Sequence, residues 1–350
     1  MSIDQEPIPA SRARRAAEGD PLAEYLEPLS ADLASVEEIF ERELASDLAC
    51  TNTLVRHVSR FRGKMLRPML LLLSARAVAP EAPVSREALT LAAVVEMVHM
   101  STLVHDDVLD EAELRRKGAT INHLRGNEAA VMLGDYLISH SYHLCSSVTA
   151  PPPYEAQWAA RLIGRTTNRL CEGELLQIEN RNNLRIGEET YHEIIRRKTG
   201  ELTAASSLLG AVFAGASEGT AARMQQFGML VGSAFQVQDD VLDLVGETTQ
   251  VGKTLGLDIE KQKLTLPLIH FLRTAPGRHR ELLCSLLRSH DPDKVEKIRN
   301  LVLPSGSIAY AAGEARRLAG EARGCLAGLA DSDARSALEG ICDFVVSRRT

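Results

Sequence analysis

The stretch Ala88–Asp110 has the sequence ALTLAAVVEMVHMSTLVHDDVLD, an apolar run that ends in acidic residues. We expect one long helix from Ala88 to about Leu109. Asp106 and Asp110 are four residues apart, so they lie on one face of that helix, at its C-terminal end. Negative charge is unfavourable there because the helix dipole is also negative at that end. Two carboxylates in this position therefore indicate a bound cation.

The same pattern recurs after a second apolar segment, in Phe235-Gln236-Val237-Gln238-Asp239-Asp240-Val241-Leu242-Asp243. The two clusters begin 133 residues apart (239 − 106), so they belong to different helices that could face each other across a bundle. Hard oxygen ligands of this kind select Mg²⁺, which keeps several waters and binds phosphate groups. One such cluster is more often a solvated helix end, but two copies predict a metal site made of Asp106, Asp107, Asp110, Asp239, Asp240 and Asp243.

The composition of the 350-residue chain predicts an all-α protein. Hydrophobic residues make up 45% and charged residues 25%, which allows a sizeable buried core. Aromatic residues are only 4%, and helix formers such as Leu and Ala dominate over short β-branched runs. Further helical segments are expected over about residues 155–182, 188–215, 220–245, 264–287 and 307–349.

No repeat of fixed period and no linker divides these segments. We therefore expect a single-domain helical bundle around a central cavity, spanning residues 21–350. Residues 1–20 contain two prolines, three arginines and few apolar residues, and we expect them to form a flexible tail.

Charge and cysteine content exclude several classes of protein. The net charge of −7 and the pI near 5.9 argue against a nucleic-acid partner, which needs a basic face. The six cysteines are scattered, as is typical of free thiols in a reducing compartment. The N-terminus lacks the apolar core of a secretory signal, and the run Met69–Ala79 is too short to span a bilayer. We expect a soluble, cytoplasmic protein with no transmembrane segment.

Basic residues accompany both acidic clusters. In Arg62-Gly63-Lys64-Met65-Leu66-Arg67-Pro68, Lys64 and Arg67 lie on one side of a turn that enters a helix. His99 lies seven residues before Asp106, on the same helix face. Arginine offers a planar fork to phosphate oxygens, and lysine a point charge. Further basic residues follow the two clusters or lie between them: Arg115, Arg116, Lys198 (followed by Thr199), Lys253 and Lys263. Together with the metal site, these basic residues suit a polyanionic substrate.

These motifs together resemble the trans-isoprenyl diphosphate synthase family, over most of the chain from about Phe61. The two aspartate-rich motifs, the G-K-x-x-R-P element of residues 63–68, His99, the paired arginines 115–116, Lys198-Thr199, Phe235-Gln236, Lys253 and the T-L-P of residues 265–267 all match. The chain departs from the family where glycine or proline is usual: the residues found there are Arg62, Lys117, Ala119 and Gln262.

The resemblance implies a Mg²⁺-dependent prenyltransferase in which about three ions lie between the two motifs. Catalysis would depend on Asp106, Asp107, Asp110, Lys198, Asp239 and Asp240. The allylic diphosphate would be bound by Arg115, Lys198, Thr199, Gln236, Lys253 and Lys263, and isopentenyl diphosphate by Gly63, Lys64, Arg67, His99 and Arg116. The allylic carbocation would be attacked by the double bond of isopentenyl diphosphate, and no side-chain base is required.

Product length depends, by the same resemblance, on the helix before the first motif. The growing chain would run past Val94, Met97, Val98, Ser101 and Thr102, none of which is aromatic. In this family a bulky aromatic residue at the position of Ser101 or Thr102 stops elongation, so we expect a deep tunnel and a medium or long product. A neighbouring helix or a partner subunit could close the tunnel instead.

Other functions remain as alternatives. A short-chain farnesyl or geranylgeranyl diphosphate synthase differs only in product length. A class I terpene cyclase usually carries an N-D-x-x-S-x-x-x-E element, which this sequence lacks. A regulatory subunit of a heteromeric synthase commonly loses motif aspartates, whereas this chain keeps all six. From the family we also expect a homodimer and a transient contact with a membrane when the product leaves.

Overall fold

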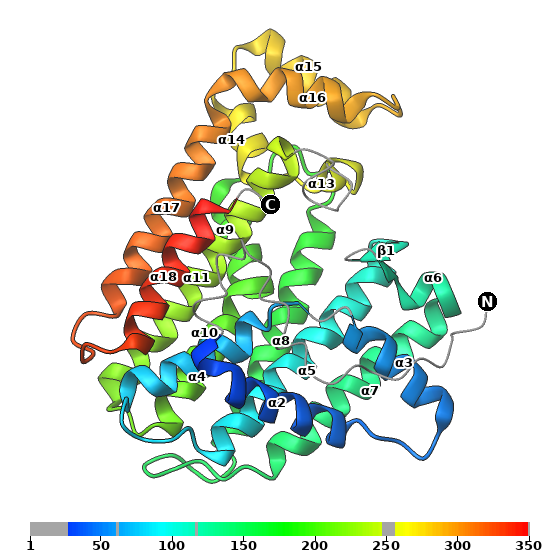
Figure 1. The fold of residues 1–350 in the computed structure, drawn as a ribbon. Coiled ribbons are helices and arrows are strands. Elements are labelled where there is room, and N and C mark those ends of the chain that lie inside the picture. The colour runs from blue at the N-terminus through cyan, green and yellow to red at the C-terminus, as the bar shows by residue number, and fades with distance from the viewer. Residues whose placement is uncertain (1–26, 61–62, 116–117, 247–255, 349–350) are drawn as a thin grey trace.

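The structure is a computed structural model that describes residues 27–60, 63–115, 118–246 and 256–348. Most of these residues, 77%, are helical (Figure 1). In chain order the elements are η2 (Glu27–Leu29), α2 (Ser30–Glu43), α3 (Ala49–Arg60), α4 (Leu66–Val78), α5 (Arg86–Leu109), β1 (Leu114–Arg115), β2 (Gly118–Ala119), α6 (Ile121–Arg125), α7 (Asn127–Ser146), α8 (Trp158–Glu179), α9 (Glu188–Ile195), η3 (Arg196–Gly200), α10 (Glu201–Phe213), α11 (Glu218–Val245), α13 (Leu257–Glu260), α14 (Leu266–Thr274), α15 (Gly277–Arg288), α16 (Lys294–Val302), η4 (Leu303–Ser305), α17 (Ser307–Cys325) and α18 (Asp333–Ser347).

The all-α fold predicted from the composition is confirmed. In the described part of the chain the only strands are β1 and β2, a two-residue antiparallel pair that pairs Leu114 with Ala119 and Arg115 with Gly118. This small hairpin follows α5 directly and was not predicted, because two residues per strand are too few for an alternating pattern.

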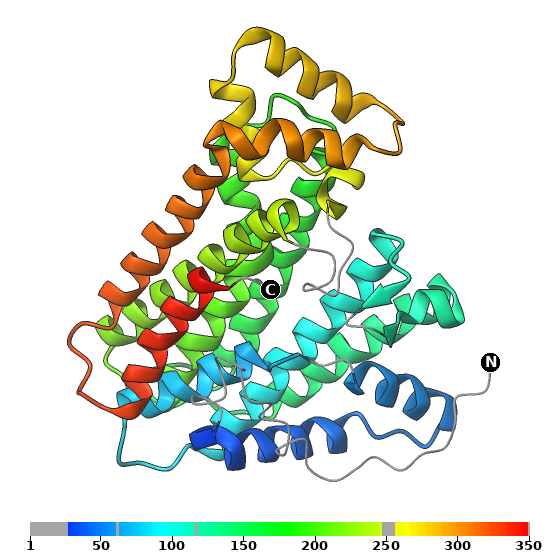
Figure 2. The same ribbon diagram turned by 45° about the horizontal axis from the view of Figure 1, so that its top comes forward.

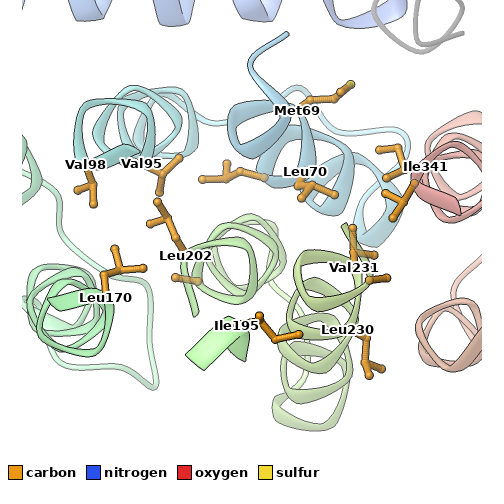
Figure 3. Packing of buried hydrophobic residues seen from close by; sticks show 14 of the residues in the cluster. Met69, Leu70, Val95, Val98, Leu170, Ile195, Leu202, Leu230, Val231 and Ile341 are labelled. Atoms are coloured by element: carbon orange, nitrogen blue, oxygen red, sulfur yellow. The ribbon is translucent and has the colours of Figure 1, made fainter. Parts of the chain in front are cut away.

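Helix α10 lies at the centre of the bundle, surrounded by α4, α5, α8 and α11 (Figure 3). Every residue from Leu202 to Val212 is buried, in keeping with a segment that carries no charged residue on any side. Glycines allow the neighbouring helices to come close. A Cβ added at Gly210 would collide with the Leu71 carbonyl oxygen of α4, and one at Gly228 of α11 would collide with the Thr203 carbonyl oxygen.

The core is continuous across the bundle. The buried apolar side chains of the described residues form one cluster that extends from Leu29 to Val345. Part of it is shown in Figure 3, where side chains of α4, α5, α8, α9, α10, α11 and α18 meet: Met69, Leu70, Val95, Val98, Leu170, Ile195, Leu202, Leu230, Val231 and Ile341. Because this cluster packs both α5 and α11 against α10, it also helps to position the C-terminal ends of these two helices, which carry the aspartates.

Helix α5 is the one described helix long and apolar enough to cross a membrane by length and composition. Most of its apolar window, 67%, is buried inside the protein. Helices with this burial are core elements, and α5 contacts α4, α7 and α10 over much of its length.

Two predicted helices are in fact interrupted. The segment expected to be helical over 264–287 is divided into α14 and α15 at Ala275-Pro276, because Pro276 lacks the N–H that a continuing helix needs. The segment 307–349 is divided into α17 and α18 by a turn that contains Gly328 at φ +86. Helices α15 and α16 lie outside the main bundle, at the top of Figures 1 and 2.

Candidate active site

A pocket of about 110 Å³ opens where α8, α9, η3, α11 and the segment after α13 meet. It combines an apolar wall with converging polar and charged groups, as small-molecule sites usually do. The polar lining consists of Gln177, Asn180, Tyr191, Lys198, Thr199, Gln236, Asp240, Asp258, Lys263 and Thr265, and the apolar lining of Ile186, Ile194, Ile195 and Leu264.

The segment η3 is a π-helical turn between α9 and α10, and it carries Lys198 and Thr199. Such turns are rare and often occur at functional sites because they shift side chains out of the α-helical register. The turn also packs tightly against α8, since a Cβ added at Gly173 would lie only 2.8 Å from the backbone nitrogen of Lys198. Thr199 Oγ1 donates to Gln236 Oε1 of α11 at 2.9 Å. This geometry directs Lys198 and Thr199 toward the pocket.

Two aspartates of the first motif pair with lysines that line the pocket. Lys198 Nζ lies 3.9 Å from Asp106 Oδ2, and Lys263 Nζ lies 3.0 Å from both carboxylate oxygens of Asp110. Burial raises the pKa of Asp106, and the charge of Lys198 opposes that rise. Asp106 and Asp110 therefore lie next to two lysines of the pocket lining, although neither carboxylate lines the pocket itself.

Asp107 points elsewhere, because successive helix residues are rotated by about 100°. Its Oδ1 accepts from Arg115 Nη2 at 2.6 Å and Nε at 2.8 Å. Burial raises the pKa of Asp107, and the hydrogen bond from Arg115 opposes that rise. Both residues line a separate pocket of about 30 Å³ with His57, Met100 and Val104. The predicted metal role of Asp107 and the predicted diphosphate role of Arg115 stay predictions, since the structure brings neither to the larger pocket.

In the second motif, Asp240 is held by two neutral donors. Tyr191 Oη donates to its Oδ2 at 2.6 Å, and Gln236 Nε2 donates to its Oδ1 at 2.9 Å. Burial and the neighbouring Asp258 raise the pKa of Asp240 well above its usual range. Asp243 accepts from the backbone N–H groups of Leu257 and Asp258 at 3.3 and 3.2 Å. Burial, with Asp258 again contributing, raises the pKa of Asp243 to about 7.

The remaining aspartate of this motif is paired with the end of the chain. Arg348 Nη1 lies 2.6 Å from Asp239 Oδ1, and its guanidinium lies 4.2 Å from the centre of the Phe235 ring. Gln238 Nε2 donates to the Arg348 carbonyl oxygen at 3.1 Å, which fixes this C-terminal segment against α11. Lys64, on the turn before α4, has its Nζ 5.5 Å from the centre of the Phe344 ring. Lys64 therefore lies beside α18, the helix that precedes Arg348.

The sequence of this chain matches a known protein family. Residues 49–303 match the family described as polyprenyl synthetase. The chain belongs to the polyprenyl synthetase family. Octaprenyl diphosphate synthase of Escherichia coli (strain K12) is 32% identical over 318 residues, which is 91% of this chain and 96% of the relative. The short chain isoprenyl diphosphate synthase of Methanothermobacter thermautotrophicus is 34% identical over 310 residues, 88% of this chain and 94% of the relative.

Solved structures agree with this assignment. The polyprenyl synthase of Caulobacter crescentus CB15, complexed with calcium and isoprenyl diphosphate, superimposes with a TM-score of 0.85 at 32% identity. The match covers 93% of this chain and 97% of that one. This polyprenyl synthetase is therefore a prenyltransferase with the all-α isoprenoid synthase fold.

The other predicted site residues lie on or next to α4 and α5, or outside the described residues. Gly63 precedes α4, Arg67 lies in the first turn of α4, and both are half-buried. His99 is half-buried on α5, where its carbonyl oxygen accepts from Thr102 Oγ1 at 2.8 Å. Arg116 and Lys253 fall outside the described residues.

The residues predicted to line a chain-length tunnel lie inside the bundle. Val94, Met97 and Val98 are fully buried, and Thr102 is half-buried. Ser101 is 3% exposed, and its Oγ donates to the Gly134 carbonyl oxygen of α7 at 2.9 Å. All of these side chains except Thr102 are shielded from solvent, and their role in product length stays a prediction.

Several site residues were missed from the sequence. Glu174 and Gln177 of α8 both bind Lys198 Nζ, the latter at 2.9 Å. Tyr191 and Asp258 line the pocket with Asp240. Two polar residues three apart on one helix, Glu174 and Gln177, were a usable signal for a shared partner. Tyr191 and Asp258 carried no comparable signal, because their neighbours come from distant parts of the chain.

Proposed function

We propose that this polyprenyl synthetase is an all-trans polyprenyl diphosphate synthase, which condenses isopentenyl diphosphate head-to-tail with an allylic diphosphate. One observation carries the proposal: Lys198 and Lys263 line the same pocket as Asp240 and also pair with Asp106 and Asp110. Two lysines that pair with the first motif thus line one cavity with a carboxylate of the second motif. Such a site suits a diphosphate that arrives with divalent cations.

The donor set of the motifs fits Mg²⁺, because carboxylates are hard oxygen ligands. Burial raises the pKa of Asp106, Asp240 and Asp243, and a divalent cation beside them would offset that cost. Among the described residues, no three His, Cys, Asp or Glu side chains meet closely enough to hold a metal on their own. We infer that about three Mg²⁺ ions bind through one or two carboxylates each, with substrate oxygens and water supplying the other ligands. The ions would neutralise charge on the leaving diphosphate.

The basic residues would divide between the two substrates. Lys198 and Lys263, with Arg115 and Lys253, would stabilise the allylic diphosphate as its carbon–oxygen bond breaks and the electron pair leaves with the phosphate. Thr199 and Gln236, hydrogen-bonded to each other, would support the same site. Isopentenyl diphosphate would be held by Gly63, Lys64, Arg67, His99 and Arg116. Its double bond would attack the cationic carbon, and transfer of a proton to the released diphosphate would then complete the addition.

We propose a medium or long product. The residues before the first motif, including Ser101 and Thr102, are not aromatic, so no bulky side chain on α5 stops the chain at that level. The Escherichia coli relative, named for an octaprenyl product, supports this proposal. The Methanothermobacter relative, named for short chains, supports the short-chain alternative.

Domain organisation, oligomeric state and cellular location follow from the same family assignment as proposals. We propose one catalytic domain over residues 21–350 with a flexible tail over residues 1–20, which lie outside the described part. We also propose a homodimer in the cytoplasm, with a transient membrane contact at product release that suits an apolar product. Nothing in the charge of the chain favours a nucleic-acid partner.

The product formed from defined primers tests the function. Purified protein is incubated with Mg²⁺, isopentenyl diphosphate and, separately, geranyl, farnesyl or geranylgeranyl diphosphate, and the products are weighed by mass spectrometry. Products longer than geranylgeranyl diphosphate are expected, and chelation of the metal should abolish them. Products that stop at farnesyl or geranylgeranyl diphosphate would keep the reaction and overturn the proposed length. No elongation by folded protein would overturn the synthase itself.

A further inference from the structure

Arg181 is a basic residue at the site that the sequence motifs did not reveal. It follows the end of α8, and its Nη2 lies 3.6 Å from Asp110 Oδ1. That distance is too long for a hydrogen bond. Asp110 already has Lys263 at 3.0 Å from both of its oxygens. Two cations therefore face a single carboxylate, which leaves one positive charge more than this aspartate can balance.

The guanidinium of Arg181 has donors that nothing in the described structure uses. Its Nε and Nη2 atoms are shielded from solvent, and neither has a hydrogen-bond partner among the described residues. Shielded donors of this kind cost free energy unless a partner arrives. A diphosphate supplies several anionic oxygens, and the planar fork of arginine matches them better than a lysine would.

The backbone holds Arg181 and Lys263 side by side. The next residue after Arg181, Asn182, donates its N–H to the carbonyl oxygen of Gln262 at 3.1 Å, and Gln262 directly precedes Lys263. Both linking residues adopt left-handed conformations, with φ of +63 for Asn182 and +60 for Gln262. Such conformations are unfavourable for residues with side chains and tend to occur at functional sites. The turn after α8 and the turn after α13 thus form one unit that directs two cations at Asp110.

We propose that Arg181 binds the diphosphate of the allylic substrate together with Lys263, a proposal that rests on the proposed function. Helix α8 ends beside the site, and the negative end of its dipole would repel an anion there. Arg181 reverses that local charge. On substrate binding its two shielded donors bind diphosphate oxygens, and Asp110, no longer facing Nη2, becomes available to a cation.

A purely structural role is the competing explanation. In that case Arg181 only neutralises Asp110, and its loss would lower stability without changing affinity for a diphosphate. Arg185 offers a matched control, because it is an exposed arginine four residues further along the same loop. Replacing either residue by glutamine removes the same charge from the same segment.

The experiment compares R181Q, R181K and R185Q with the wild-type protein. Inorganic pyrophosphate with Mg²⁺ is titrated while the melting temperature is followed, and KM is measured for farnesyl and isopentenyl diphosphates separately. We expect R181Q to weaken pyrophosphate binding and to raise KM for the allylic substrate roughly tenfold or more, which is the loss expected for a charged hydrogen bond. KM for isopentenyl diphosphate should change much less, R181K should recover part of the loss, and R185Q should resemble wild type.

Two results would overturn the proposal. R181Q could bind pyrophosphate as tightly as R185Q, or it could lose stability without ligand while keeping the full ligand-induced shift. If wild-type protein binds pyrophosphate but elongates no primer, the proposed function fails, whereas the comparison of R181Q with R185Q still decides whether Arg181 binds the diphosphate.

Discussion

At the scale of single residues, the hydrogen bond from Tyr191 to Asp240 gives a direct test of the site. Both oxygens of this buried carboxylate have a donor, Tyr191 at 2.6 Å and Gln236 at 2.9 Å. Replacing Tyr191 by phenylalanine removes one donor from a buried acceptor, which costs about 1–3 kcal/mol of stability. We expect Y191F to lower both the melting temperature, followed by circular dichroism, and kcat in the elongation assay.

Tyr310 supplies the control for this substitution. Its hydroxyl donates to Glu188 Oε2 at 2.7 Å, but the residue is 37% exposed and lies away from the pocket. Y310F removes the same atom from a similar bond, so a smaller loss of stability and an unchanged kcat are expected. If the two variants had equal kcat values, the orientation of Asp240 would not depend on Tyr191.

The aspartates could be predicted from the sequence more completely than their partners. Asp106 and Asp110 each pair with a lysine of the same pocket, because helix geometry puts residues four apart on one face. The same geometry turns Asp107 away, toward Arg115, although the motif treats the three acids as a group. Tyr191 and Arg181 could not be predicted, because their contacts depend on how α8 and α9 pack against the rest of the bundle.

At the scale of elements, the turn after α13 contains a residue in an unfavourable conformation. Gln262 has φ +60, where a Cβ clashes with the following backbone, and the family usually has glycine at this position. Glycine removes the clash but loses more entropy on folding. We expect Q262G to raise the free energy of unfolding by about 0.5–1 kcal/mol, measured as a shift of the urea midpoint at constant slope.

Asn182, at φ +63, is the comparison for this turn. Asparagine tolerates the left-handed region better than glutamine does, so N182G should gain less stability than Q262G. A Q262G protein no more stable than wild type would mean that contacts of the Gln262 side chain outweigh the strain of its backbone.

The π-helical turn η3 should make stability depend on pH. A hydrogen bond from Arg196, helped by Arg197, lowers the pKa of Glu193 to about 2 against some opposition from burial. A carboxylate with a lowered folded pKa stabilises the protein above its unfolded pKa of about 4.3, and this contribution is lost as pH falls toward about 2. At pH 7 we expect E193Q to be less stable than wild type by up to about 1 kcal/mol, because the ion pairs are partly exposed.

The difference between E193Q and wild type should shrink steadily as the pH of thermal unfolding is lowered from about 5 to about 2. E189Q, which changes an exposed glutamate of the same helix, controls for the loss of one negative charge. A stability difference that stayed constant over this pH range would show that the pairing of Glu193 with the two arginines contributes nothing to folding.

Helices were predicted well from the sequence where one apolar face runs without interruption, as in α5 and α11. Breaks were predicted poorly. The apolar spacing predicts one helix through Pro276, but the missing N–H of this proline interrupts it. The spacing of apolar residues carries no information about backbone donors. The π-helical turn η3 has no local sequence signature, because its conformation depends on its packing against α8 and α11.

At the scale of the whole molecule, the packing around α10 brings distant segments to one site. Helices α5 and α11 both contact α10, and each carries its aspartates at its C-terminal end. The C-terminal segment completes the arrangement, because Arg348 pairs with Asp239. The sequence predicts that the two helix ends meet, because carboxylates at the C-terminal end of a helix are unfavourable unless positive charge lies nearby. Its details depend on the close glycine contacts that set the distances between helices.

Product length is the property of the whole molecule that one substitution can test. Ser101 is 3% exposed, and its hydroxyl donates to the Gly134 carbonyl oxygen at 2.9 Å, so a small side chain separates α5 from α7 here. Phenylalanine at this position would fill space along the path proposed for the growing chain. We expect S101F to shorten the product, measured by mass spectrometry, and to cost about 1–3 kcal/mol through overpacking.

S101A separates these two effects, because it removes the hydrogen bond to Gly134 without adding bulk. It should lower stability slightly and leave product length unchanged. A folded S101F protein that still makes wild-type products would mean that the chain does not pass Ser101. The limit on length would then lie on another helix or on a partner subunit, and the argument from the absence of aromatic residues on α5 would fail.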